Sequence, residues 1–318
     1  MRQLPWHGSM SDHSTGHDKN GSGTCPESAA KRAMNQDRQR VMAAHLESIV
    51  AASRELRHRQ RVNVVTTGSS ADRELRLRAS DGADANPVIE AHIQGLKAVV
   101  AAEDFIGAAV DLAGRPERSF ATMAVLRGAA EAAAQAFWYL DPSIGLDERE
   151  ARALGGLRDA VGSARRFGRK GKLLFASEVA SGLDALDEVV RVHPADARGL
   201  PTWEKLLREL GRTLAFEDRL SDAGLEALSN AAHSVKGARD QIVIEWEDDG
   251  RPVLHTHPAT QWGYWYVANL FVSAVSHAAL LFGWPTDEWL EDATLQSEQL
   301  QQLFNEVLAE RASGHKPK

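Results

Sequence analysis

The stretch that decides the fold runs from Ser119 to Leu140 and reads SFATMAVLRGAAEAAAQAFWYL. On a helical wheel its apolar side chains cover two opposite faces, and a helix that is apolar nearly all round is usually central in a fold. Its main charged groups, Arg127 and Glu131, stand one turn apart. Neither can be buried without a partner. We therefore predict a core helix with an ion pair that is either an internal contact or part of a pocket in which Arg127 holds an anion.

The composition around this stretch is that of an ordinary globular chain, with 318 residues, 43% hydrophobic and 25% charged. A net charge of -7 gives no general attraction to nucleic acid or to an anionic membrane. Cys25 is the single cysteine, which excludes an intramolecular disulfide and a thiolate metal cluster. The first thirty residues lack the apolar run of a signal peptide. We expect a cytoplasmic protein.

The periodicity of apolar residues predicts a mainly α protein, a multi-helix bundle with one short β-hairpin near 241–257. We expect four segments: a disordered tail over 1–34, a basic helix and variable segment over 35–86, a helical domain over 87–311, and a disordered tail over 312–318. The expected helices span 35–61, 88–112, 119–140, 147–166, 173–190, 202–214, 221–239, 262–282 and a final stretch to about 311. The alternating residues 62–78 are consistent with a second, exposed hairpin.

One segment is apolar enough to raise the question of a membrane, since no Asp, Glu, Lys or Arg occurs between Arg251 and Asp287. Both flanks are acidic and neither carries a basic anchor. Asn269, Ser273 and His277 also recur every four residues on one face, which would be costly against lipid. These features favour a buried core helix, and we expect no membrane span.

Two more helices carry polar groups beside an apolar face. The helix over 221–239 brings Ser229, Asn230 and His233, and the helix over 262–282 brings Asn269 and His277. Such polar flanks tend to meet in a shared network or pocket. We therefore take His233 and Glu131 as candidate catalytic groups. The candidate ligand-binding residues are Arg127, Ser229, Asn230, Asn269 and His277.

Metal and nucleotide chemistry have little support in the sequence. His255 and His257 would lie on one side of a strand, but a third ligand is not identifiable nearby. The chain has no phosphate-binding loop and no dinucleotide fingerprint. We expect no metal and no cofactor. The stretch 38–78 holds nine arginines against four acidic residues, which suggests a nucleic-acid patch or, more in keeping with its pattern, a solvated helix face.

Three separated motifs occur in order along the chain: LRGAAEA at 126–132 running to WYLDP at 138–142, ALSNAAH at 227–233, and FGW at 282–284. They resemble an uncharacterised group of all-helical actinobacterial proteins, and the likeness covers about Val88 to Trp289. A more distant likeness is to the helical HEPN superfamily, which implies an RNase with an Arg-x4-6-His motif acting across a dimer. This chain departs from that pattern, because no arginine stands four to six residues before His233.

These observations favour a regulatory or otherwise non-enzymatic helical domain, a homodimer that binds a small-molecule ligand or a partner through an internal polar network. One alternative is a HEPN-like RNase or other hydrolase, with His233 as general base and Arg127 for a phosphate. The other is nucleic-acid binding through residues 38–78.

Overall fold

The computed structural model describes residues 26–79, 87–115, 118–169, 199, 201–213, 243–246, 252–255 and 257–314. Over these residues the chain is mainly helical, as predicted. The helices are α1 (Pro26–Arg59), α2 (Ser70–Ala79), α3 (Pro87–Leu112), α4 (Ser119–Tyr139), α5 (Leu146–Arg169), α7 (Trp203–Thr213), α10 (His257–Phe282) and α11 (Asp287–Gly314). The predicted helices over 173–190 and 221–239 lie outside the described residues.

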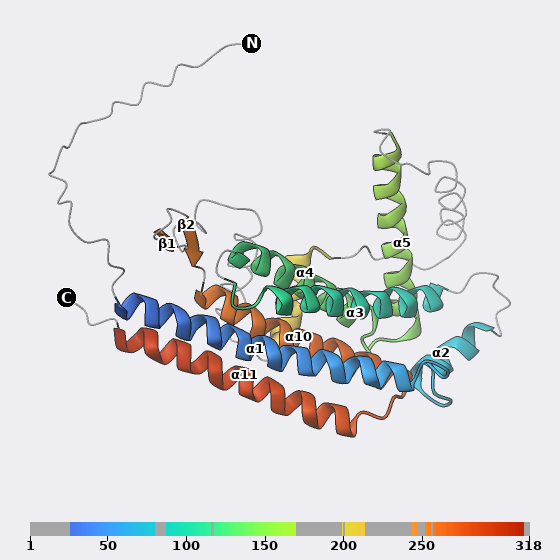
Figure 1. Cartoon of the computed structure of the whole chain (residues 1–318). Helices are drawn as coiled ribbons and strands as arrows, with labels where there is room; N and C mark the ends of the chain where they lie inside the picture. The colour runs from blue at the N-terminus through green and yellow to red at the C-terminus, as the bar shows by residue number, and fades with distance from the viewer. Residues whose placement is uncertain are drawn as a thin grey trace, which may run out of the picture.

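The long helices form an elongated bundle, with α5 standing across it (Figure 1). Helix α4 packs against α3 on one side and α10 on another, while α1 contacts α3, α10 and α11. Because the middle and end of α4 are covered from several directions, all of its alanines between 129 and 136 are at most 7% exposed. The prediction of a central apolar helix is therefore confirmed.

Small residues let α3 and α4 approach closely. A Cβ added at Gly95 would lie 2.4 Å from Cγ of Leu140, and one added at Gly128 would lie 2.9 Å from the Phe105 ring. Gly95 of α3 meets Leu140, the residue that follows α4, and Phe105 of α3 meets Gly128 of α4. This reverse order shows that the two helices run antiparallel. The close packing of α3 against α4 therefore depends on glycine, which has no Cβ, at these two positions.

Helix α10 contains a segment, Thr260–Phe282, long and apolar enough to cross a membrane by length and composition, and 67% of its most apolar window is buried inside the protein. Tyr264 and Tyr266 have no exposed surface. The Tyr264 hydroxyl donates a 3.0 Å hydrogen bond to the carbonyl of Ala109 on α3. These contacts are those expected of a core helix.

Three predicted boundaries differ in the structure, and one of them is the start of α10 at His257, five residues before the expected 262. Helix α1 begins at Pro26, inside the segment expected to be a tail, and α11 continues to Gly314.

The prediction of an exposed hairpin over 62–78 is wrong, because Ser70–Ala79 is helix α2. The Ser69 hydroxyl accepts a 3.1 Å hydrogen bond from the backbone N–H of Asp72 and so caps this helix. The segment is helical and has an N-terminal cap, although its alternation of apolar and polar residues is typical of a strand.

Strands β1 (Val243–Trp246) and β2 (Pro252–His255) pair antiparallel, with Val243 opposite His255 and Trp246 opposite Pro252. The residues that would connect them lie outside the described part of the chain. The hairpin near 241–257 as a whole stays a prediction. His257 is the first residue of α10, so it does not share a strand with His255.

Candidate functional site

The predicted Arg127–Glu131 contact is present, with 2.7 Å between Arg127 Nε and Glu131 Oε1. Their side chains are 14% and 30% exposed, so the pair lies at a half-buried flank of α4 and not in a sealed core. Ser229, Asn230 and His233, which were expected to meet this pair, lie outside the described residues. The predicted network around these groups stays a prediction.

The polar stripe of α10 divides between two neighbours. Asn269 accepts a 3.1 Å hydrogen bond from the hydroxyl of Ser297 on α11, and its own side-chain amide donates to the carbonyl of Trp265. The ring of His277 instead stacks on Phe137 of α4, with centroids 4.0 Å apart. Burial lowers the pKa of His277, and the nearby Asp141 carboxylate opposes that shift. Asn269 and His277 thus face different helices.

A buried ionic cluster at the turn between α4 and α5 was not predicted. Its centre is Arg149, which has no exposed surface. Arg149 donates from Nη1 to the carbonyl of Tyr139 at 2.7 Å and from Nη2 to the carbonyl of Asp141 at 2.8 Å. Its Nε lies 2.9 Å from Oε2 of Glu74 on α2. One guanidinium therefore fixes the end of α4 and holds α2 against α5.

Glu74 has a second partner, because His92 Nε2 donates to the same carboxylate oxygen at 3.1 Å. Burial alone would raise the pKa of Glu74, but His92 and Arg149 together hold the pKa of that carboxyl below its ordinary value. For His92, burial lowers the pKa, the hydrogen bond to Glu74 opposes this, and Arg149 adds to it. The folded state therefore favours an ionised Glu74 beside a neutral His92.

Arg152 follows Arg149 by one helical turn and makes further contacts between α5 and the end of α4. It donates to the carbonyl of Trp138, its guanidinium lies 5.0 Å from the centroid of the Trp138 ring, and it pairs with Glu148 at 2.9 Å. The last carbonyls of a helix have no partner within the helix. The two arginines supply such partners, and this gives the WYLDP stretch at 138–142 a structural role.

The sequence carried little signal for this cluster. Arg149 and Arg152 stand among Glu148 and Glu150 in a charged run that is typical of a solvated helix face. Burial of Arg149 depends on the tertiary fold, which brings Glu74 of α2 to the Arg149 guanidinium. The one local sign of the cluster is that Arg149 comes soon after the Asp141-Pro142 pair that follows α4. Cations are favourable near helix C-termini.

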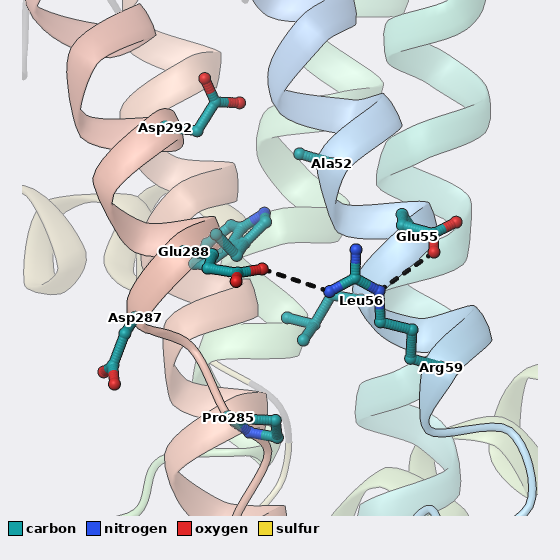
Figure 2. A pocket seen from close by; sticks show the side chains of 9 residues that line it. Ala52, Glu55, Leu56, Arg59, Pro285, Asp287, Glu288 and Asp292 are labelled. Atoms are coloured by element: carbon teal, nitrogen blue, oxygen red, sulfur yellow. Dashed lines mark hydrogen bonds and ion pairs between the residues drawn. The ribbon is translucent and has the colours of Figure 1, made fainter.

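A groove of about 460 Å³ lies between α1 and α11, near the turn that follows α10 (Figure 2). This volume lies in the range of small-molecule sites. Its lining residues come from the last turns of α1, the turn and the first turns of α11. They are Ala52, Glu55, Leu56, Arg59, Pro285, Asp287, Glu288, Trp289 and Asp292.

The charges of this α1–α11 groove are mostly negative, with four carboxylates against the single guanidinium of Arg59. Arg59 Nε donates to Glu55 at 3.0 Å, and its Nη1 donates to Glu288 at 3.4 Å across the groove (Figure 2). The three side chains are between 56% and 89% exposed, so solvent screens these pairs. Such exposed contacts can exchange for contacts with another cation.

The floor of the groove is apolar and includes one buried polar atom. Leu56 and Trp289 are 5% and 6% exposed. The indole N–H of Trp289 is buried and has no hydrogen-bond partner in the described part of the structure, whereas the indole of Trp284 donates to the carbonyl of Val64 at 2.7 Å. A buried donor without an acceptor costs about 1–3 kcal/mol. The groove thus combines exposed carboxylates with an apolar floor.

Among the described residues, no group of three or more His, Cys, Asp or Glu side chains is arranged to hold a metal ion. Comparison of the chain with protein-family models, with curated proteins and with solved structures finds no match.

Proposed function

We propose that this protein is a non-enzymatic binding domain whose α1–α11 groove takes the ammonium or guanidinium group of a ligand or partner. The observation that carries this proposal is the position of Arg59, whose guanidinium lies between Glu55 and Glu288 in a groove lined by Trp289. The contacts of the Arg59 guanidinium with Glu55 and Glu288 are the kind of contact that we expect a ligand's cationic group to make. Aromatic side chains and carboxylates are the usual recognition groups for organic cations.

The buried ionic cluster is a structural contact and shares no residue with the proposed binding groove. Glu74, His92 and Arg149 bond to one another, and Arg149 also bonds to two backbone carbonyls. A general base needs a lone pair directed at a substrate proton. In this cluster the charged groups are instead committed to holding α2, α4 and α5 together.

The other two functions gain no support from the described residues. The hydrolase hypothesis needs Arg127 for a phosphate, yet its Nε is bound to Glu131. The nucleic-acid hypothesis needs an unpaired basic face. Most of the nine arginines over 38–78 instead pair with acidic side chains of this chain: Arg38, Arg40, Arg54, Arg57, Arg59, Arg76 and Arg78.

Titration calorimetry with agmatine, an alkyl guanidinium that also carries an amine, tests the proposal. We expect measurable binding that weakens as salt is added, because exposed charges are screened. The variant Glu288→Gln should weaken binding by roughly tenfold, which corresponds to about 1.4 kcal/mol. Glu291→Gln, an exposed change outside the groove, is the matched control. Equal binding by the two variants would contradict the proposal.

A second titration separates a small ligand from a partner protein. A short peptide with one arginine in an otherwise uncharged sequence offers the same guanidinium together with a longer chain that can contact more of the groove lining. Tighter binding of this peptide than of agmatine would identify the natural ligand as a peptide segment. Failure of both probes to bind would overturn the proposed function.

A further inference from the structure

Helix α3 carries a line of four apolar side chains, three of which are exposed. Ile89, Ile93 and Val100 are 45%, 39% and 40% exposed, and Leu96 on the same line is partly buried. The spacing of these four residues is four, three and four. This is the spacing of the apolar seam in a coiled coil, which keeps all four on one stripe of the helix.

The stripe borders the face that α3 uses inside the bundle, because Leu96 also packs against the hydrophobic core. Ala91, Ala98, Ala102, Ile106 and Ala109 are buried on that face. Single exposed apolar residues are normal on a protein surface, but a continuous line over three turns is typical of a contact with another helix. The stripe therefore marks an interaction surface.

The stripe is complementary to itself when two copies of α3 run antiparallel. Its residues are symmetric about the point midway between positions 94 and 95. Ile89 would then lie opposite Val100 of the second copy, and Ile93 opposite Leu96. Each of these layers occurs twice around a two-fold axis. A two-fold interface requires this property, since the same patch must fit itself.

The charges beside the stripe fit the same arrangement. Glu90 and Lys97 each follow a stripe residue and occupy equivalent positions of the seven-residue pattern. In antiparallel pairs such positions face one another, which sets Glu90 beside Lys97 of the second copy and Lys97 beside its Glu90. A parallel pair would give neither residue the other as a partner.

We propose that a second copy of this chain covers the α3 stripe, with the two α3 helices antiparallel about a two-fold axis. The stripe spans eleven residue steps, about 17 Å of helix. A contact of this length makes a dimer that dissociates on dilution. The proposal is independent of the α1–α11 groove, because the two surfaces share no residue.

Sedimentation of the full chain over a concentration series tests this dimer. We expect the wild-type protein to move from monomer to dimer as concentration rises. Ile93→Asp should remain monomeric throughout, because two carboxylates would enter the inner layers, and its circular dichroism should match the wild type. Leu280→Asp, on α10 and 63% exposed in the wild type, is the matched control and should dimerise normally.

A charge exchange tests the antiparallel geometry. Glu90→Lys alone and Lys97→Glu alone should each weaken the dimer roughly tenfold, since each sets like charges opposite one another. The double variant should regain the wild-type dissociation constant. Failure of the double variant to recover would overturn the antiparallel arrangement.

Two outcomes would overturn the proposal as a whole. A wild-type chain that stays monomeric at every concentration excludes a second copy on this surface. If Ile93→Asp also lowers the melting temperature of that monomer, a segment of the same chain covers the stripe. A dimer that survives Ile93→Asp would place its interface elsewhere.

Discussion

The buried guanidinium of Arg149 donates a 2.7 Å hydrogen bond to the carbonyl of Tyr139, ten residues earlier in the chain. This contact ties the start of α5 to the last residue of α4. The same side chain pairs with Glu74 of α2, so one arginine joins three helices. Its removal would leave the Glu74 carboxylate and two backbone carbonyls without this partner.

Replacing Arg149 should therefore destabilise the protein strongly. We expect Arg149→Met to lower the free energy of unfolding by about 3–5 kcal/mol, because a buried charge loses its main counter-ion. Urea denaturation followed by circular dichroism measures this change. Arg76→Met is the matched control, since Arg76 is 68% exposed and its pair with Asp72 should contribute under about 1 kcal/mol. Equal losses would show that the cluster is not essential to the fold.

Stability should also fall as the solution becomes acidic near neutral pH. Burial lowers the pKa of His92 below its ordinary value of 6.5 in the folded protein. Below that pH the unfolded chain binds more protons than the folded one, so stability is complete above pH 6.5 and is lost as the pH drops towards the folded pKa. His277 acts in the same direction.

Thermal melting across this pH range measures the effect. The variant His92→Gln should show a smaller drop in melting temperature between neutral and mildly acidic pH. His58→Gln, at an exposed position of α1, should keep the wild-type pH dependence. An unchanged slope in His92→Gln would mean that His92 is not the group that senses pH.

The sequence predicted the parts of this fold that depend on local periodicity. The expected span 119–140 agrees with Ser119–Tyr139, and the expected span 88–112 agrees with Pro87–Leu112. Both helices are long and apolar, and their ends carry clear stop signals. Helix α2 was missed because two sequence signals conflict. Ser69 is a helix-capping residue, whereas the alternation of apolar and polar residues that follows is typical of a strand.

The candidate sites depend on contacts that no local pattern encodes. Arg127 and Glu131 are one turn apart, so their pairing could be predicted from spacing alone. Glu74 and Arg149 are 75 positions apart, and their contact requires the whole arrangement of α2, α3 and α5. The α1–α11 groove likewise joins residues separated by more than two hundred positions. Sequence reasoning therefore found the local pair and missed the long-range ones.

Two glycines of α3 should respond in opposite ways to the same substitution. Gly95→Ala should lower the free energy of unfolding by about 1–3 kcal/mol, because the new methyl group would meet the Leu140 side chain. Gly107→Ala should raise it by about 0.5–1 kcal/mol, since the nearest atom is an Arg54 nitrogen 3.9 Å away and alanine is the better helix former. Chemical denaturation of both variants measures the difference. Equal effects would contradict the close α3–α4 approach.

The Arg127–Glu131 pair should contribute little to stability. Its side chains are partly exposed and lie one turn apart on the same helix, where such pairs contribute about 0.2–0.5 kcal/mol. We expect Arg127→Met to change the free energy of unfolding by less than about 1 kcal/mol in a urea titration. A loss of several kcal/mol would instead identify the pair as a buried internal contact.

Removing the internal cation should open the α1–α11 groove to an added one. Arg59 occupies Glu55 and Glu288, so an incoming guanidinium must displace it. We therefore expect Arg59→Met to bind agmatine at least roughly threefold more tightly in calorimetry, with the fold unchanged by circular dichroism. Arg40→Met is the control, since Arg40 is also exposed and paired, with Asp37, but does not line the groove. Equal or weaker agmatine binding by Arg59→Met would mean that Arg59 does not compete with the ligand for Glu55 and Glu288, and would contradict the proposed site.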